Sequence, residues 1–199
     1  MPSSTAARRD RLADAGIELL AREGARGLTH RKVDAAAGEP PGTTSRYFRT
    51  REALMTGVVD RVRELHFADL GRAARQPTDP ASVAEHLAAM VQTALTTHRS
   101  RHLAIAELFL ESTRRPALHA TMAALRTAQI QLVRDVHLAA GVELTSRQAA
   151  LLVTAITGLV HVALTTPEAI DARSPDDVRE WVHRTVELVR GAPSGRNVA

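Results

Sequence analysis

The stretch Thr29–Phe48, which reads THRKVDAAAGEPPGTTSRYF, decides the fold of this chain. Threonine at its first position is a residue type that caps helix starts, and the residues that follow it to Ala37 carry apolar groups at helical spacing. Gly38 then supplies the helix end, because glycine readily adopts the left-handed conformation that closes a helix. We therefore predict a short helix that starts after Thr29 and ends at Ala37.

A second short helix is predicted from Gly42 to Phe48, after two prolines. Pro40 and Pro41 forbid a helix across the junction, yet Pro41 suits the first turn of a new helix, where the missing N–H would have no partner. Two short helices joined by a glycine-led turn form a helix-turn-helix, whose second helix lies in the major groove of DNA. The same pattern fits a three-helix subdomain with a polar surface, and periodicity alone does not separate the two interpretations.

The second of these helices carries small hydroxyl groups and one long donor. We expect Thr43, Thr44, Ser45 and Arg46 to face outward, where such side chains fit close to base edges and phosphates. Residues 1–63 carry 12 Arg or Lys against 8 Asp or Glu, whereas the remaining residues carry 14 of each. An excess of this size also occurs on ordinary solvated surfaces. Charge alone therefore does not identify a nucleic-acid partner.

Helical periodicity continues on both sides of this stretch. Upstream, residues 5–23 form one apolar stripe, and Gly24 is expected to close that helix as a left-handed cap. Downstream, we expect a fourth helix over about residues 50–75 and a loop at residues 76–80. The upstream stripe consists of Leu12, Ala15, Leu19 and Leu20.

The remainder of the chain is predicted to form five more helices. Aromatic and β-branched runs are too sparse for a sheet, so the fold class is all-α with about nine helices. Thr145 and Gln148 have the spacing of a capping box, which marks one of the starts. We divide the chain into a three-helix DNA-binding domain, residues 1–50, and a larger helical regulatory and dimerisation domain, residues 51–199. The five helices cover about residues 80–97, 99–111, 116–139, 145–164 and the segment from 174 onward.

Several classes of protein are excluded by what the sequence lacks. The chain has no cysteine, which removes disulfides, thiolate nucleophiles and cysteine-based metal sites. The amino terminus holds no apolar run of signal-peptide length, so a cytoplasmic location is expected. No nucleophile-elbow, zinc-protease or phosphate-loop motif is present, so we expect neither an enzyme nor a bound cofactor.

The segment from Arg8 to Leu54 resembles the amino-terminal domain of TetR-type transcriptional regulators. Each matching feature is weak by itself, but their fixed spacing over about fifty residues makes the combined signal strong. The features are the first apolar stripe, Gly24, Ala37–Gly38, Gly42–Thr43, Tyr47–Phe48 and the REAL tetrapeptide Arg51–Leu54.

This resemblance implies a set of DNA contacts. The start of the first short helix would approach the DNA backbone, the second would lie in the major groove, and Phe48 would belong to the core. Pro40 and Pro41 depart from the serine and lysine that are frequent in the family, and Ser45 departs from a tyrosine. Asp34, at a position that is more usually small and apolar, either forms a hydrogen bond within the turn or faces solvent. The expected DNA-binding residues are Thr29, Arg31, Lys32, Pro41, Gly42, Thr43, Thr44, Ser45, Arg46, Tyr47 and Arg51.

The last two predicted helices have apolar residues on more than one face, which requires two packing partners. One partner is the domain core, and the other is either the rest of a single bundle or a second subunit. The resemblance implies a second subunit, with a four-helix interface about a twofold axis that matches a palindromic operator. The expected interface residues are Leu152, Ile156, Leu159, Val160, Ala163, Val182, Val186 and Val189.

The middle of the helical bundle is where members of this family bind varied small molecules. Large apolar side chains and one histidine there suit a small, mostly apolar ligand, although all of them equally suit a plain core. His98 and His102 are four residues apart, but arginines lie between them and no acidic ligand is near, so no metal site is expected. The candidate ligand-binding residues are Phe67, Met90, Phe109, Met122 and His161.

These observations together predict a ligand-responsive transcriptional regulator. It would repress by binding a palindromic double-stranded operator as a homodimer, and a small molecule would release it. The rival interpretation is a helical protein-interaction module without sequence-specific DNA binding, which leaves the polar face of residues 42–47 unexplained.

Overall fold

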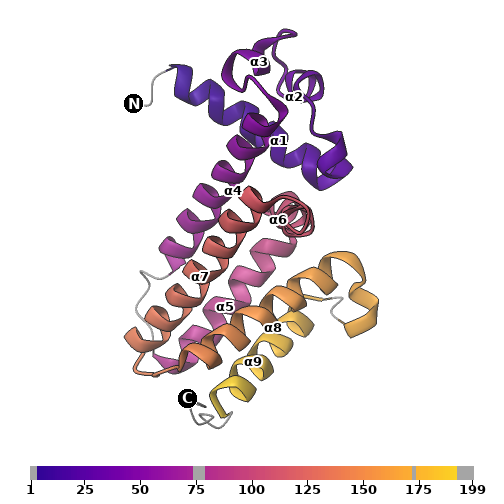
Figure 1. The fold of residues 1–199 in the computed structure, drawn as a ribbon. Coiled ribbons are helices and arrows are strands. Elements are labelled where there is room, and N and C mark those ends of the chain that lie inside the picture. Colours follow the sequence, from indigo (N-terminus) through magenta and orange to yellow (C-terminus); the bar gives the residue numbers. More distant parts are fainter. Residues whose placement is uncertain (1–3, 74–78, 172–173, 192–199) are drawn as a thin grey trace. The chain divides into compact units, whose positions relative to one another are not determined.

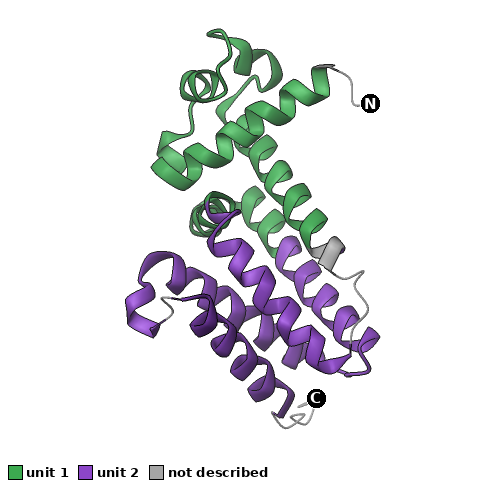
Figure 2. Cartoon of the chain, turned by 180° about the vertical axis from the view of Figure 1, so that it is seen from behind, with its two compact units in different colours: residues 1–69, 100–123 green, residues 70–99, 124–199 purple. Residues whose placement is uncertain are grey.

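The chain forms an all-helical protein, as predicted. A computed structural model describes residues 4–73, 79–171 and 174–191 and contains, within those ranges, nine α-helices, one short 3₁₀ helix and no strand (Figure 1). The chain divides into two compact units, drawn in green and purple in Figure 2. Unit 1 comprises residues 1–69 and 100–123, and unit 2 comprises residues 70–99 and 124–199.

Unit 1 contains the helices predicted around the opening stretch. They are α1 (Ser4–Gly27), α2 (His30–Ala36), α3 (Thr43–Tyr47), most of α4 (Arg51–Ala73) and nearly all of α6 (Arg99–Ser112). Its core confirms the predicted stripe of α1 and the core position of Phe48, because all of these side chains are buried. The largest members of this core are Leu12, Leu19, Leu20, Leu28, Val33, Phe48, Leu54, Val58, Leu108 and Met122.

Two glycines let α4 approach its neighbours closely. A Cβ atom on Gly57 would lie 2.2 Å from the Phe48 ring, and a Cβ on Gly16 of α1 would lie 2.5 Å from a Val58 methyl group. Both distances are shorter than van der Waals contact, so any larger residue would overpack the core. The end of the helix-turn-helix therefore packs directly against α4.

The end of α1 differs from the prediction. Gly24 has φ 67° and ψ −175°, which interrupts the helical dihedrals but is not the left-handed helical conformation expected of a cap. Beyond this break the N–H of Ala25 donates to the Glu107 carboxylate of α6 at 2.9 Å. The break is thus stabilised by a side chain from a distant helix of the same unit, which sequence spacing does not reveal.

Unit 2 is a second helical bundle. It contains α5 (Pro80–Leu95), most of α7 (Pro116–Ala139), α8 (Ser146–Thr165), the 3₁₀ helix η1 (Pro167–Ile170) and α9 (Pro175–Gly191). Asp79 caps α5 by accepting from Ala81 and Ser82, and the predicted capping box of Thr145 is formed at α8. The short helix η1 was not predicted, and residues 76–78 of the predicted loop lie outside the described residues.

Helices α5, α8 and α9 pack on one another within unit 2. Among the described residues α8 is the one helix long and apolar enough to cross a membrane, by length and composition only. One-third of its most apolar window is buried inside the chain. Packing against α5 and α9 explains the apolar residues on the side of α8 that is buried within the chain.

Candidate nucleic-acid interface

The turn between α2 and α3 is organised by the carboxylate of Asp34. Asp34 accepts hydrogen bonds from Gly42 N at 2.8 Å, from Thr44 N at 2.7 Å and from the Thr44 hydroxyl at 2.5 Å. Its side chain is buried, which by itself raises the pKa of this carboxyl, but the hydrogen bonds from Thr44 and Gly42 outweigh burial and hold the pKa below its ordinary value. Asp34 therefore acts from α2 as the cap that α3 lacks within its own sequence.

This arrangement corrects the prediction that Thr44 faces outward. Thr44 is 0% exposed, because its amide and hydroxyl both point inward to Asp34. A five-residue helix must turn one side toward the core, and here that side is Thr44. The open question about Asp34 is also decided, since it bonds within the turn and does not face solvent.

The outer side of α3 presents the remaining predicted contacts. Ser45 and Arg46 are exposed, and Thr43 and Tyr47 are half-buried. The Thr43 hydroxyl donates to the carbonyl of Pro40 at 2.7 Å, which braces the start of the helix. This side of α3 is polar, with hydroxyl and guanidinium groups available to a partner.

The turn before α3 is slightly different from the prediction. Gly42 is the N-cap residue, with φ 88°, so Pro41 precedes the helix and does not lie in its first turn. Both residues are exposed. Only glycine adopts this backbone conformation without strain, which explains its place between the prolines and α3.

The start of α2 also presents exposed polar groups. Thr29 caps the helix by accepting from Lys32 N at 3.4 Å, as predicted. Arg31 and Lys32 are exposed, and the Lys32 ammonium pairs with Glu23 of α1. That pairing holds the pKa of Glu23 below its ordinary value. Lys32 therefore has a fixed intramolecular partner when no other anion is present.

Two side chains, His30 and Arg51, stabilise the helix-turn-helix in ways that the sequence did not predict. His30 was not singled out from the sequence, yet its Nε2 donates to the carbonyl of Phe48 at 2.6 Å and joins the start of α2 to the end of α3. Arg51 is exposed, but its guanidinium donates to the carbonyl of Ala25 at 2.8 Å. Arg51 thus closes the end of α1 in addition to any contact it makes with DNA.

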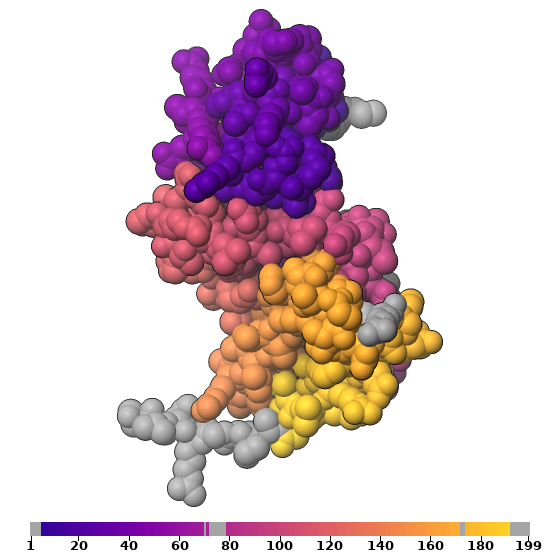
Figure 3. Space-filling model, turned by 90° about the vertical axis from the view of Figure 1, so that its right-hand side faces the viewer, coloured from indigo at the N-terminus to yellow at the C-terminus, as the bar shows by residue number. Residues whose placement is uncertain are grey.

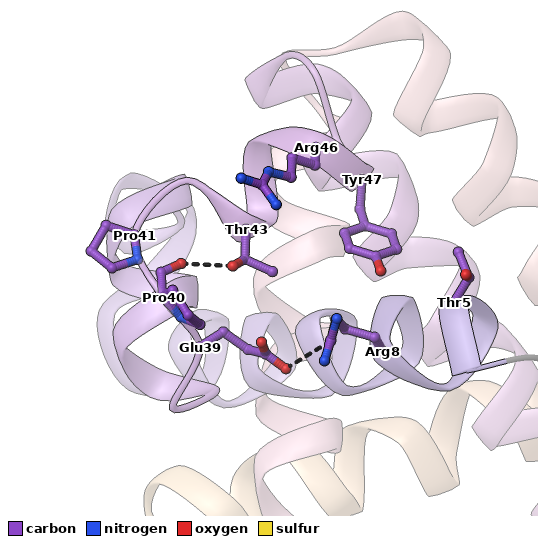
Figure 4. Close-up of a pocket in the computed structure, with 8 residues that line it drawn as sticks. All are labelled: Thr5, Arg8, Glu39, Pro40, Pro41, Thr43, Arg46 and Tyr47. Atoms are coloured by element: carbon purple, nitrogen blue, oxygen red, sulfur yellow. Dashed lines mark hydrogen bonds and ion pairs between the residues drawn. The ribbon is translucent and has the colours of Figure 1, made fainter.

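A hollow of about 570 Å³ opens between α1 and the helix-turn-helix (Figure 4). Its lining comes from three places. Thr5 and Arg8 lie on α1, Glu39, Pro40 and Pro41 lie in the turn, and Thr43, Arg46 and Tyr47 lie on α3.

The predicted ligand-binding residues are distributed over both units. In unit 1, Met122 is buried, and Phe67 and Phe109 are half-buried. In unit 2, Met90 is half-buried, while His161 is exposed on α8 and so does not face the interior of that unit. His102 packs edge-on against His66 with ring centres 5.8 Å apart, and no group of three or more metal-ligating residues occurs in the described part of the chain.

The predicted dimer residues lie mostly inside unit 2. Ile156 and Ala163 are half-buried, and the other six are buried within the single chain. Large apolar groups are exposed instead on the other side of the same two helices: Leu151 is 50% exposed, Trp181 44% and Leu188 75%. The buried six are Leu152, Leu159, Val160, Val182, Val186 and Val189.

The fold and this face define the class of the protein as a helical DNA-binding protein of the helix-turn-helix type. The family model described as the tetracyclin repressor-like C-terminal domain matches residues 78–188, more than half of the chain. The chain therefore belongs to the TetR family of transcriptional regulators. This match lies outside Arg8–Leu54, so two separate parts of the sequence point to the same family.

Solved structures agree with this assignment. A member of the TetR family from Streptomyces coelicolor A3 is 30% identical, with a TM-score of 0.68 over 89% of this chain and 97% of its own. The multidrug binding protein EbrR in complex with ethidium is also 30% identical, with a TM-score of 0.63 over 89% of this chain and 98% of its own. A transcriptional regulator from Rhodococcus sp. Rha1, 20% identical with a TM-score of 0.73 over 91% of this chain and 95% of its own, shows the fold alone. No curated protein is similar enough in sequence to count as a relative.

Proposed function

We propose that this chain is a cytoplasmic, ligand-released repressor that binds a palindromic operator as a homodimer and acts by binding alone, without catalysis. In this proposal residues 1–50 form the DNA-binding domain and residues 51–199 the regulatory and dimerisation domain. The observation that carries it is the polar outer side of α3, held in place by the three hydrogen bonds to Asp34. A recognition helix needs such a side because base edges are read by hydrogen bonds.

Selection of bound duplexes from a genomic DNA library tests this function directly. Purified protein is expected to enrich an inverted repeat, and binding is expected to weaken steeply as salt rises because phosphate contacts release counterions. Arg46→Ala is expected to cost about 1–3 kcal/mol of binding free energy if the guanidinium reads a base edge. Arg63→Ala, an exposed arginine on α4, is the control and is expected to bind as the wild type does. Failure to enrich any sequence would favour the interaction-module interpretation.

The structure suggests a revised dimer interface for this proposal. We infer that the exposed side of α8 and α9 packs against a second copy, because its large apolar groups lie on two helices that are in contact, seen in orange and yellow in Figure 3. Trp181 is held in place there by a hydrogen bond from its indole N–H to the carbonyl of Ile170 at 2.8 Å. Leu151 and Leu188 provide the flanking apolar surface.

Light scattering during gel filtration tests this interface. Leu188→Glu combined with Leu151→Glu is expected to convert a dimer into a monomer, because two charges would be buried without partners. Leu110→Glu is the control, since Leu110 is 58% exposed on α6 of unit 1. A double variant that stays dimeric would exclude this side of α8 and α9 from the interface.

Small-molecule binding is a separate part of the proposed function. EbrR has been solved with proflavin and with ethidium, at 29% and 30% identity to this chain. We propose that this chain likewise binds a small, mostly apolar molecule, with Phe67, Phe109 and Met122 of unit 1 as candidate contacts. Ethidium is a convenient probe, since its fluorescence reports binding. Ethidium binding that also releases the selected operator would support the ligand response, and Phe109→Ala is expected to weaken it.

A further inference from the structure

The hollow between α1 and α3 has an unusual arrangement of charge. Arg8 Nε and Arg11 Nη2 both approach the same oxygen of Glu39, at 3.3 and 3.2 Å. The Glu39 side chain is only 12% exposed, whereas the two arginine side chains are 49% and 55% exposed. One carboxylate balances one guanidinium, so this cluster keeps an excess positive charge at the rim of the hollow.

Other groups of the hollow add to its affinity for an anion. Arg46 is exposed on α3 and contributes a second uncompensated guanidinium, and Glu39 is the one acidic residue in its described lining. The ring of Tyr47 points across the hollow toward α1, where Thr5 and Arg8 lie (Figure 4). Guanidinium and hydroxyl groups that converge from two helices form the donor set that binds phosphate oxygens.

The position of the hollow favours a phosphate of a nucleic-acid backbone over a free phosphate ion as its ligand. It is lined on one side by Thr43, Arg46 and Tyr47, residues of the same helix whose outer side is proposed to face base edges. A strand that passes over α3 would therefore carry its backbone across the hollow. Pro40 and Pro41 have no N–H groups, so the turn itself offers little to a phosphate and the side chains must supply the contacts.

We propose that Arg8, oriented by Glu39, binds a backbone phosphate of DNA in this hollow. This assignment rests on the proposed DNA-binding function and adds a contact from α1 to it. Glu39 takes the place of the phosphate in the free protein and keeps Arg8 extended beside the hollow. When DNA binds, Arg8 turns to the phosphate and Glu39 remains paired with Arg11, so no buried carboxylate loses its partner.

The experiment measures affinity for two duplexes of unrelated sequence over a range of salt concentrations. A phosphate contact is independent of sequence, so Arg8→Ala is expected to weaken binding to both by about tenfold. It should also reduce the slope of log affinity against log salt by about 0.9. Arg8→Lys keeps the charge and is expected to retain most of that slope. The control is Arg63→Ala, because Arg63 on α4 is 53% exposed, close to the value for Arg8.

The outcomes separate this assignment from the function on which it rests. If the wild type binds duplexes and Arg8→Ala keeps the wild-type affinity and slope, the hollow is not a phosphate site, whether or not an operator is found. If Arg8→Ala weakens binding to one sequence only, Arg8 reads a base and the assignment is also wrong. If the folded wild type shows no salt-dependent duplex binding at all, both the assignment and the proposed function fall. Circular dichroism of each variant confirms that it is folded.

Discussion

Replacing Asp34 by alanine should loosen the turn and the helix that it caps. The change removes the acceptor of three hydrogen bonds, two of which come from Thr44, a residue with no exposed surface. Gly42 is exposed, so water can replace the carboxylate at its N–H. The N–H and hydroxyl of Thr44 have no such replacement, and each buried donor without a partner costs about 1–3 kcal/mol. For the two donors together, we expect the free energy of unfolding to fall by about 2–6 kcal/mol.

Urea denaturation followed by circular dichroism measures this loss. With a denaturant dependence of about 2 kcal/mol per molar for a domain of this size, the midpoint should fall by about 1–3 M. Asp34→Asn keeps one oxygen for Thr44 but presents its amide group to Gly42 N, so its loss should be smaller. Asp60→Ala is the control, because Asp60 is an exposed partner of Arg63 and such pairs contribute little. A midpoint for Asp34→Ala within 0.2 M (about 0.4 kcal/mol) of the wild type would refute the reasoning.

Three further predictions concern the same unit. The pKa of Asp34 is lowered in the folded protein, so its contribution to stability is complete above the ordinary pKa of about 3.8. That contribution is lost as pH falls through the lower pKa of the folded state. Acid titration of the stability of the wild type and of Asp34→Asn should show this difference. Gly57→Ala should cost about 1–3 kcal/mol in urea denaturation because its Cβ would meet the Phe48 ring. Gly24→Ala should cost a similar amount, about 1–3 kcal/mol, because the backbone conformation at Gly24 suits glycine alone and the added Cβ would lie 3.0 Å from Glu107. A melting temperature equal to that of the wild type would contradict this prediction.

Much of the helical layout was predictable because the signals that start and stop helices are local. Proline at positions 80, 116 and 175 stands at the first residue of a helix, and the capping box at Thr145 formed as its spacing indicated. The family could also be inferred from sequence, since its motifs occupy fixed positions along a short stretch. The short helix η1 was missed because four residues carry too little periodicity to be recognised.

The proposed DNA-facing side of α3 was only partly predictable, because packing decides which side chains of a helix point to the core and which point to solvent. From the sequence Thr43 and Thr44 were equivalent hydroxyl residues of one short helix. Only the approach of Asp34 from α2 turns Thr44 inward and leaves Thr43 near the surface. His30 gave no sequence signal, since its partner is a backbone carbonyl at residue 48.

The sequence by itself determined the all-α class, the approximate positions of the α-helices and the family, because local backbone preferences and spaced motifs encode them. Tertiary structure alone decided which side of an apolar helix is buried. Helices α8 and α9 are apolar on two sides, so six of the eight residues predicted for a dimer interface are buried within the single chain, while Trp181 and Leu188 are exposed. Tertiary structure alone also decided that Glu39 pairs with Arg8 and Arg11, because Glu39 is close to both arginines in space but far from them along the chain. Such contacts depend on how helices pack, and no local pattern records that packing.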